Sequence, residues 1–199
     1  MHIFSPCMLK NIFITGASGS GKTTVIKYLL NKFPTTYLNI SYTSRKPRKN
    51  EIHGKDYYFL TEEEFEQKIK NGELLEYVKF KGNYYGTPKN CITGFDKTKI
   101  HRIFDIELEG IKFFHKHLQE IGHTDNLFIC LRATEDIIRN RLNLRLGIST
   151  FELENRISSV VDINNFINEF NFDFIVDSNQ EMTQMLSEIE NILFNFLNK

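Results

Sequence analysis

The sequence predicts an α/β fold, in which helices cover a mostly parallel sheet and a smaller antiparallel lobe is inserted into it. Three observations support this fold class. A short apolar run near the start leads through a glycine-rich turn into a helical pattern. Apolar runs and helical patterns alternate again after residue 100. Between residues 39 and 97, strand formers, basic residues and Gly/Asn turns surround one short helical pattern, which is typical of an antiparallel insertion.

Four apolar runs are the expected strands of the parallel sheet. The first, NIFIT at 11–15, precedes a helical pattern over 22–32. The runs at 101–106 and 126–131 are each followed by a helical pattern, and the run at 172–176 precedes a closing amphipathic helix through residue 193. Strands that alternate with helices favour parallel pairing, because each helix carries the chain back across the sheet.

These patterns divide the chain into three parts. Residues 1–38 and 98–199 are expected to form the core, and residues 39–97 the inserted lobe. Within the core, residues 141–156 contain arginines and few large apolar residues, so we expect a small, mobile and solvated lid there. Hinges for movement of the lobe are expected around 38–40 and 97–99.

Composition limits the possible partners. The 199 residues suit one domain, and Lys+Arg equals Asp+Glu at 25 each, so no global field attracts nucleic acid or an anionic membrane. The three cysteines, Cys7, Cys91 and Cys130, share no CxxC spacing, which favours a reducing compartment and a cytoplasmic location. No apolar run is long enough to span a membrane, and residues 1–7, ahead of Met8, lack the apolar stretch of a secretory signal.

The glycine-rich turn is a phosphate-binding motif. The sequence GASGSGKT at 16–23 fits G-x-x-x-x-G-K-[ST], between an expected strand and an expected helix as the motif requires. Its backbone N–H groups and the helix dipole would hold phosphates, the lysine would reach the β- and γ-phosphates, and the threonine hydroxyl would bind Mg²⁺. The motif does not identify the phosphoryl acceptor. The residues expected to bind ATP are Gly16, Ala17, Ser18, Gly19, Ser20, Gly21, Lys22, Thr23 and Thr24.

The inserted segment carries the most specific pattern. It reads SYTSRKPRKNEIHGKDYYF over 41–59, followed by a glutamate at 76 and by GNYYGTP over 82–88. The order and spacing of these residues resemble guanylate kinases, whose lobe carries S-x-x-x-R-x-P-R-x-G-E-x-x-G-x-D-Y-x-F and a later N-Y-Y-G-[ST] turn. With the phosphate loop, the resemblance extends over most of the chain. It implies transfer of the ATP γ-phosphoryl group to GMP or dGMP, with Mg²⁺ between the nucleotides.

The chemistry of the lobe independently fits a nucleoside monophosphate. Arg45 and Arg48 flank a proline and can clamp a phosphate dianion, with the phenols of Tyr57 and Tyr85 as neutral donors. A carboxylate at Glu76, within the apolar stretch LLEYV, is out of place unless it is paired or functional.

The resemblance assigns three more groups in the lobe to GMP. It implies that Glu76 reads the guanine N1–H and 2-amino edge, and that the hydroxyls of Ser41 and Thr87 meet the guanine O6. Glu51 belongs to the same GMP-binding set.

The second half matches the family less closely. Asp105 ends an apolar run, where an acid can orient magnesium-bound water. The segment resembles the family's D-x-D-x-Q-G, but Glu107 replaces the second Asp and Glu109 replaces the Gln. We include Glu107 among the expected GMP-binding residues. Asp177 stands where the family has an Asn near the adenine.

The lid region supplies three arginines. Arg141 and Arg145 are four residues apart, hence on one helical face, and Arg156 follows. The resemblance implies that they close over ATP and stabilise charge on the transferring phosphoryl group, although the family's R-G-T reads Arg145-Leu146-Gly147 here. The expected catalytic residues are Lys22, Arg45, Asp105, Arg141, Arg145 and Arg156.

Two other functions fit the sequence less well. A scaffold module that holds a phosphopeptide would not need the intact GKT, and a sugar-phosphate kinase would give Glu76, Ser41 and Thr87 no base to read. The sequence thus predicts an ATP:GMP phosphotransferase that needs Mg²⁺ and no dedicated general base, acts as a monomer or weak dimer, and binds neither nucleic acid nor membrane.

Overall fold

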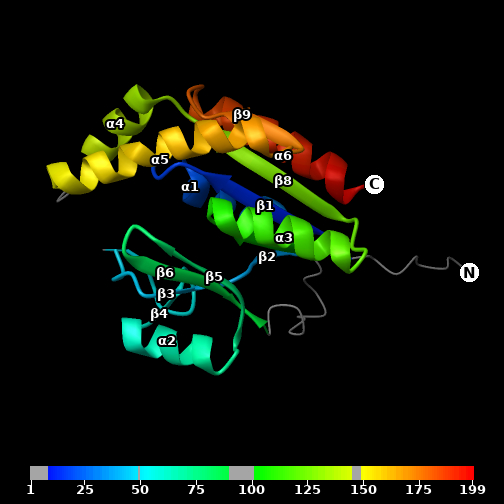
Figure 1. Ribbon diagram of the computed structural model, residues 1–199. Coiled ribbons are helices and arrows are strands. Elements are labelled where there is room, and N and C mark those ends of the chain that lie inside the picture. Colours follow the sequence, from blue (N-terminus) through cyan, green and yellow to red (C-terminus); the bar gives the residue numbers. More distant parts are fainter. Residues whose placement is uncertain (1–8, 49, 90–100, 145–148) are drawn as a thin grey trace, which may run out of the picture.

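The computed structural model describes residues 9–48, 50–89, 101–144 and 149–199, and contains two sheets (Figure 1). The larger sheet has five parallel strands in the order β2-β7-β1-β8-β9. Its strands are β1 (Asn11–Gly16), β2 (Thr36–Leu38), β7 (His101–Asp105), β8 (Asn126–Arg132) and β9 (Phe174–Asp177). The predicted α/β class and parallel core sheet are therefore confirmed. The short strand β2 had not been predicted, because three residues carry too little pattern.

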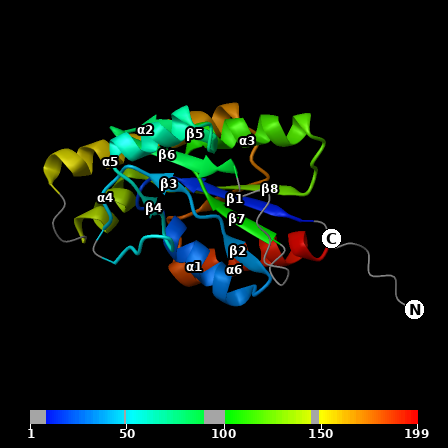
Figure 2. The ribbon, with the colours of Figure 1, turned by 90° about the horizontal axis from the view of Figure 1, so that it is seen from below.

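Helices cover both faces of this sheet (Figure 2). The helices of the core are α1 (Lys22–Lys32), α3 (Leu108–Glu120), α4 (Glu135–Asn143), α5 (Thr150–Glu169) and α6 (Met182–Leu197). Alternate residues of β1 serve opposite faces: Ile12 and Ile14 pack against α1 and α6, whereas Phe13 packs in the cluster that contains α3. Because every residue of β1 is buried, the strand reads as one apolar run, as expected of a central parallel strand.

Aromatic stacking joins the central strands on the α3 side. The ring of Phe13 lies 4.6 Å from that of Phe104 in β7 and 4.8 Å from that of Phe128 in β8, both nearly parallel. These rings come from neighbouring strands in register, Phe13 being opposite Phe104 and Phe128. The stack fixes the register of the strands whose carboxyl ends form the site.

The smaller sheet has four strands in the order β4-β3-β6-β5. Its elements are β3 (Tyr42–Thr43), β4 (Tyr58–Phe59), α2 (Glu62–Lys70), β5 (Leu74–Phe80) and β6 (Asn83–Pro88). The pairs β3–β6 and β5–β6 are antiparallel as predicted, but β3 and β4 pair in parallel, so the sheet is mixed. All four strands fall within the predicted lobe 39–97, whose boundaries as a domain stay a prediction.

The structure describes part of the expected lid. Arg141 lies in the last turn of α4 and Arg156 within α5, and both helices pack into the core through Leu142 and Leu153, which are buried. Most of the other described residues between 141 and 156 are exposed, as a solvated stretch requires, and the lid as a separate unit stays a prediction. Arg145 and the turn at 145–148 lie outside the described residues.

Three further sequence predictions can be located on the structure. Cys130 is buried in β8, while Cys7 and Cys91 lie outside the described residues. The hinge expected at 38–40 includes the end of β2, where the backbone N–H of Asn39 donates to the carbonyl of Ile103, and the second hinge, at 97–99, is not described. Among the helices described here, none has the length and apolar character needed to cross a membrane.

Candidate active site

The phosphate loop joins β1 to α1 and depends on glycine geometry. Gly16, Gly19 and Gly21 have φ of 151°, 92° and 99°, values that side-chain-bearing residues rarely adopt. A Cβ on Gly16 would lie 2.6 Å from the carbonyl oxygen of Leu131. The loop is thus held against β8 at a distance that only glycine allows, and it leads directly into the first turn of α1.

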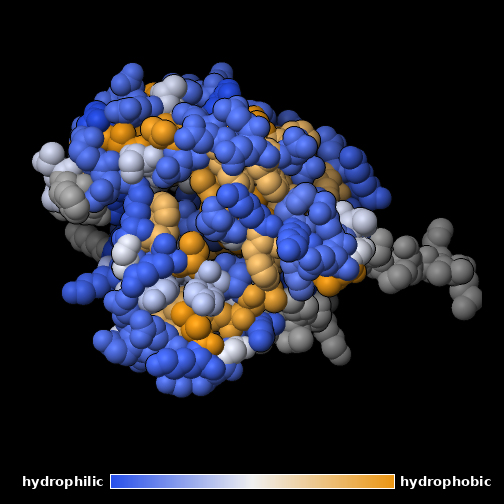
Figure 3. All heavy atoms as spheres, in the orientation of Figure 1, coloured by the Kyte–Doolittle hydropathy of each residue, from blue (hydrophilic) through white to orange (hydrophobic). Residues whose placement is uncertain are grey.

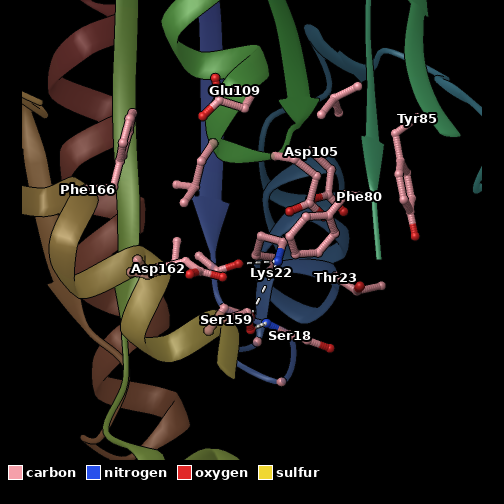
Figure 4. A pocket seen from close by; sticks show the side chains of 18 of the residues that line it. Ser18, Lys22, Thr23, Phe80, Tyr85, Asp105, Glu109, Ser159, Asp162 and Phe166 are labelled. Carbon is pink, nitrogen blue, oxygen red and sulfur yellow. Dashed lines mark hydrogen bonds between the residues drawn. The ribbon is translucent and has the colours of Figure 1, made fainter. Parts of the chain in front are cut away.

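Lys22 is the first residue of α1 and reaches back over its own loop. Its Nζ donates to the carbonyl of Gly16 at 2.6 Å and to that of Ala17 at 3.4 Å. Thr23 and Thr24 follow on the exposed side of the helix start. Figure 4 shows Lys22, Thr23 and Asp105 around one cavity, with Asp105 at the carboxyl end of β7. The ammonium group therefore already lies beside the loop that would hold phosphates.

Helix α5 contacts the same loop. The guanidinium of Arg156 donates to the Ser18 hydroxyl at 2.9 Å, and the Ser18 backbone N–H donates to the Ser159 hydroxyl at 3.3 Å. Arg156, which the sequence assigned to a lid, thus lies at the phosphate loop. Ser159 had not been predicted to have a role, since a serine within a helix carries no distinctive pattern.

Arg141 reaches the loop only indirectly. Its guanidinium donates to the hydroxyl and to the carbonyl of Ser178 at 2.8 and 2.7 Å. The Ser178 hydroxyl is buried and donates to the Ser20 carbonyl at 2.6 Å. Arg141 therefore supports the phosphate loop from behind, through the turn after β9, and does not line the main cavity in this structure.

A cavity of about 420 Å³ separates the phosphate loop from the smaller sheet (Figures 3 and 4). Its walls come from the loop and the start of α1, from the ends of β7 and α3, from α5, and from the smaller sheet. Six of the lining residues are Lys22, Thr23, Arg45, Arg48, Tyr85 and Asp105. The cavity thus brings the expected ATP-binding loop and the expected phosphate clamp of the acceptor to one space.

Glu51 organises the acceptor side of this cavity. Both its carboxylate oxygens accept from the Arg45 guanidinium, at 2.9 and 3.0 Å, and one also accepts from the Arg48 backbone N–H at 2.7 Å. The guanidinium of Arg48 lies 3.5 Å from the same carboxylate. Burial acts to raise the pKa of Glu51, but these hydrogen bonds and charges hold it below its usual value. Glu51 is therefore ionised and fixes both arginines.

Two tyrosines and two acids face each other across the cavity. Burial is the main cause that holds the pKa of Tyr57 well above its usual value, and the carboxylates of Asp105 and Glu107 add to it. Burial also raises the pKa of Tyr85. Both phenols thus remain proton donors. Burial raises the pKa of Asp105 and of Glu107, and the Lys22 ammonium opposes this shift for both.

Glu76 and Thr87 are partners across β5 and β6. The Thr87 hydroxyl donates to a Glu76 carboxylate oxygen at 2.6 Å, and a Cβ on Gly110 of α3 would lie 3.6 Å from the other oxygen. Burial raises the pKa of Glu76, while hydrogen bonds from Thr87 lower it. With Ser41, Glu107 and others, these residues surround a second cavity of about 20 Å³, which has room for about one water molecule. The three predicted base-reading residues are therefore brought together.

The residues present suit a magnesium-bound nucleotide. Mg²⁺ commonly takes few protein ligands and completes its shell with phosphate oxygens and water, so a full protein cage is not needed. Within the described residues, no cluster of His, Cys, Asp or Glu could hold a metal by itself. Thr23 offers its exposed hydroxyl, and Asp105 offers a carboxylate, in the same cavity as the phosphate loop.

Comparison with known proteins gives a consistent result. A sequence model of the guanylate kinase family matches residues 8–196. A guanylate kinase of Protochlamydia amoebophila is 36% identical over 180 residues, 90% of this chain and 89% of that protein. One from Clostridium tetani is 37% identical over 183 residues, 89% of this chain and 83% of that protein.

A solved structure supports the same relationship. The crystal structure of guanylate kinase from Anaplasma phagocytophilum has a TM-score of 0.73 and 26% sequence identity, and the match covers 96% of this chain and 88% of that chain. The family match over nearly the whole sequence, and the relatives that share over 30% identity, agree with the geometry described above. The chain therefore belongs to the guanylate kinase family.

Proposed function

We propose that this protein transfers the γ-phosphoryl group of ATP to GMP or dGMP, giving ADP and GDP or dGDP. The observation that carries the proposal is that one cavity has the phosphate loop on one wall and the Arg45–Glu51–Arg48 cluster on the other. Such an arrangement suits two phosphorylated substrates that meet end to end. Family membership makes guanylate kinase the activity expected of it.

On the donor side, loop residues 16–24 bind the ATP phosphates through backbone N–H groups and Lys22. The Lys22 ammonium would exchange its contacts with the Gly16 and Ala17 carbonyls for phosphate oxygens. Arg156 adds positive charge at Ser18. Arg141 acts as a positioning residue through Ser178, and Arg145 is kept as a lid residue from the sequence pattern alone.

On the acceptor side, Arg45 and Arg48 bind the GMP phosphate, with the phenols of Tyr57 and Tyr85 as further donors. The planar guanidinium groups suit a phosphate dianion better than ammonium groups would. Because Glu51 already orients both arginines, little side-chain entropy is lost when the phosphate binds.

The base is read at the smaller cavity. A carboxylate at Glu76 accepts from guanine N1–H and the 2-amino group, while the hydroxyl of Ser41, and that of Thr87 once it turns away from Glu76, would donate to O6. Glu107, at the start of α3, can accept from the 2-amino group, because its side chain is longer than that of the family's Asp. The cavity of about 20 Å³ must widen to admit guanine, which fits a lobe that moves on binding.

Mg²⁺ bound to Thr23 and the nucleotide would neutralise charge on the phosphates, and Asp105 would orient its water ligands. The chain's own task is to align the two substrates, offset their repulsion and exclude water from the cavity. A dedicated general base is not required, because little proton transfer precedes the loose transition state of phosphoryl transfer.

Two alternative functions explain fewer of these residues. A phosphopeptide-binding scaffold module would leave Lys22 and Thr23 without a task, and a sugar-phosphate kinase would leave Glu76 without one. Action as a monomer or weak dimer, a cytoplasmic location and the absence of nucleic-acid or membrane partners stay predictions.

A coupled assay of ADP release tests the proposal directly, with ATP, Mg²⁺ and each of GMP, dGMP, AMP, UMP, CMP and dTMP. We expect turnover with GMP and dGMP and loss of turnover on removal of Mg²⁺ by a chelator. Rapid ADP release that does not depend on GMP, or equal turnover with all monophosphates, would contradict it.

A further inference from the structure

The tip of the β5–β6 hairpin has an unusual residue. Phe80 pairs with Asn83, so Lys81 and Gly82 form a two-residue loop, with φ of 49° and 77°. Two positive φ values define a type I′ turn, whose first position normally takes Asn, Asp or Gly. Lys81 is the only non-glycine residue with positive φ in the described part of the chain. A lysine in this conformation is strained, which suggests a role for its side chain.

The Lys81 side chain crosses from the smaller sheet to the core. Its Nζ donates to the hydroxyl of Ser158 on α5 at 3.2 Å. The Ser158 hydroxyl itself donates to the Asn155 carbonyl within the helix, so its lone pairs face the lysine. Figure 1 shows this hairpin beneath the yellow helix α5. The contact therefore joins the smaller sheet to α5 beside the main cavity, which Phe80 and Ser159 line.

The charges around the lysine act on it in opposite directions. Partial burial lowers the pKa of Lys81, while the carboxylates of Asp162 on α5 and Glu107 on the core side oppose that shift. The positive charge of Arg156 repels the Lys81 ammonium and lowers its pKa further. A cation at the hairpin tip is therefore attracted by two acids that belong to the core.

The same stretch of α5 contacts the phosphate loop. Arg156 and Ser159 both contact Ser18, and Ser158 lies between them in sequence. One short segment of helix therefore touches the ATP-binding loop on one side and the acceptor lobe on the other.

We propose that Lys81 is a positioning residue that latches the acceptor lobe onto α5 and so helps to hold GMP against the phosphate loop. The expected effect on the KM for GMP rests on the proposed function, whereas the contact between the hairpin and α5 does not. The latch favours the closed arrangement, in which the GMP phosphate and the ATP phosphates share one cavity. It acts on GMP through the position of the hairpin and makes no contact with the nucleotide.

Lys81→Asn tests the proposal, because asparagine tolerates the left-handed conformation and cannot reach Ser158. We expect the KM for GMP to rise about fivefold, the scale of one lost charged hydrogen bond, with a smaller change in kcat. The melting temperature should stay the same or rise, since the strained lysine is gone. Lys79→Asn is the matched control, because Lys79 on the same hairpin pairs with Glu62 inside the smaller unit at 2.6 Å.

Ser158→Ala separates a latch from a direct contact with substrate. For a latch, the double variant Lys81→Asn/Ser158→Ala should have the same KM for GMP as Lys81→Asn alone. The proposal would be overturned if the two substitutions raised the KM for GMP independently, so that their fold-changes multiply in the double variant. It would also be overturned if the KM for GMP of Lys81→Asn equalled that of Lys79→Asn.

Amide hydrogen exchange supplies a readout independent of activity. Without nucleotides, Lys81→Asn should speed exchange over residues 153–165 of α5, on the far side of the cavity from the substitution, and Lys79→Asn should not. Unchanged exchange in α5 would overturn the latch even in an active enzyme. Absence of GMP turnover in the unmodified protein would instead refute the proposed function.

Discussion

The Arg45 guanidinium and the Glu51 carboxylate form a two-pronged ion pair, with hydrogen bonds of 2.9 and 3.0 Å and both side chains less than one-fifth exposed. The guanidinium also lies 5.5 Å from the ring centre of Tyr57. The sequence placed both residues in the GMP-binding set and expected Arg45 to clamp the phosphate. In the structure Glu51 holds Arg45 in place, and Arg45 also donates to the Lys46 carbonyl, so we expect its remaining N–H groups to serve the phosphate.

Glu51→Gln should weaken both stability and GMP binding. The substitution leaves a half-buried guanidinium without its counter-charge, so we expect a loss of about 1–3 kcal/mol in the free energy of unfolding and a KM for GMP raised by about tenfold. Denaturant unfolding and steady-state kinetics measure the two effects. An unchanged KM would show that Arg45 does not need Glu51 to bind substrate.

The pH dependence of stability gives a second check on Glu51. Its pKa is lowered by folding, so its contribution is fully present above the unfolded value of about 4.3 and is lost as pH falls through the lower folded value. Glu51→Gln should therefore remove part of the acid sensitivity of unfolding below about pH 4.5. A variant that loses stability with falling pH as steeply as the parent would contradict this assignment.

Arg141→Met should destabilise the fold as well as slow the reaction. Arg141 makes two hydrogen bonds to Ser178, which supports the carbonyl of Ser20, so we expect a loss of about 1–3 kcal/mol in unfolding free energy. The double variant Arg141→Met/Ser178→Ala should lose less unfolding free energy than the sum of the losses in the two single variants. Full stability with lost activity would instead fit an arginine that acts only on phosphate.

Lys22→Met should abolish transfer and leave the fold intact. The Lys22 ammonium lies at the edge of the cavity and contacts only carbonyls of its own loop in the described hydrogen bonds, so its removal creates no void in the core. We expect kcat to fall by at least about 10²-fold, the scale of one lost charge-stabilising group, with little change in melting temperature. Turnover equal to that of the parent would exclude phosphoryl transfer at this loop.

The sequence predicted the regular parts of the molecule well. Residues 22–32 form a helix as expected, because a strand, a glycine turn and helical spacing are all local signals. The run at 11–15 becomes a strand that extends only one residue further. The parallel pairing of these strands also followed from the alternation of elements.

What the sequence did not predict depends on contacts between distant segments. Nothing local indicates that Ser178 meets Arg141, or that Lys81 crosses to Ser158, since 37 and 77 residues separate these pairs. The order of the residues in the lobe identified the site, but the division of work between Arg45 and Glu51 needed their geometry.

The most direct test of the central claim is the ratio of kcat/KM for GMP to that for AMP, in the parent protein and in Glu76→Ala. Adenine offers an acceptor at N1 and no group at position 2, so a half-buried Glu76 carboxylate would meet AMP without donors. We predict that the parent prefers GMP by at least about 10³-fold and that Glu76→Ala removes most of this preference. Comparable activity on AMP and GMP in the parent would show that Glu76 does not read the base.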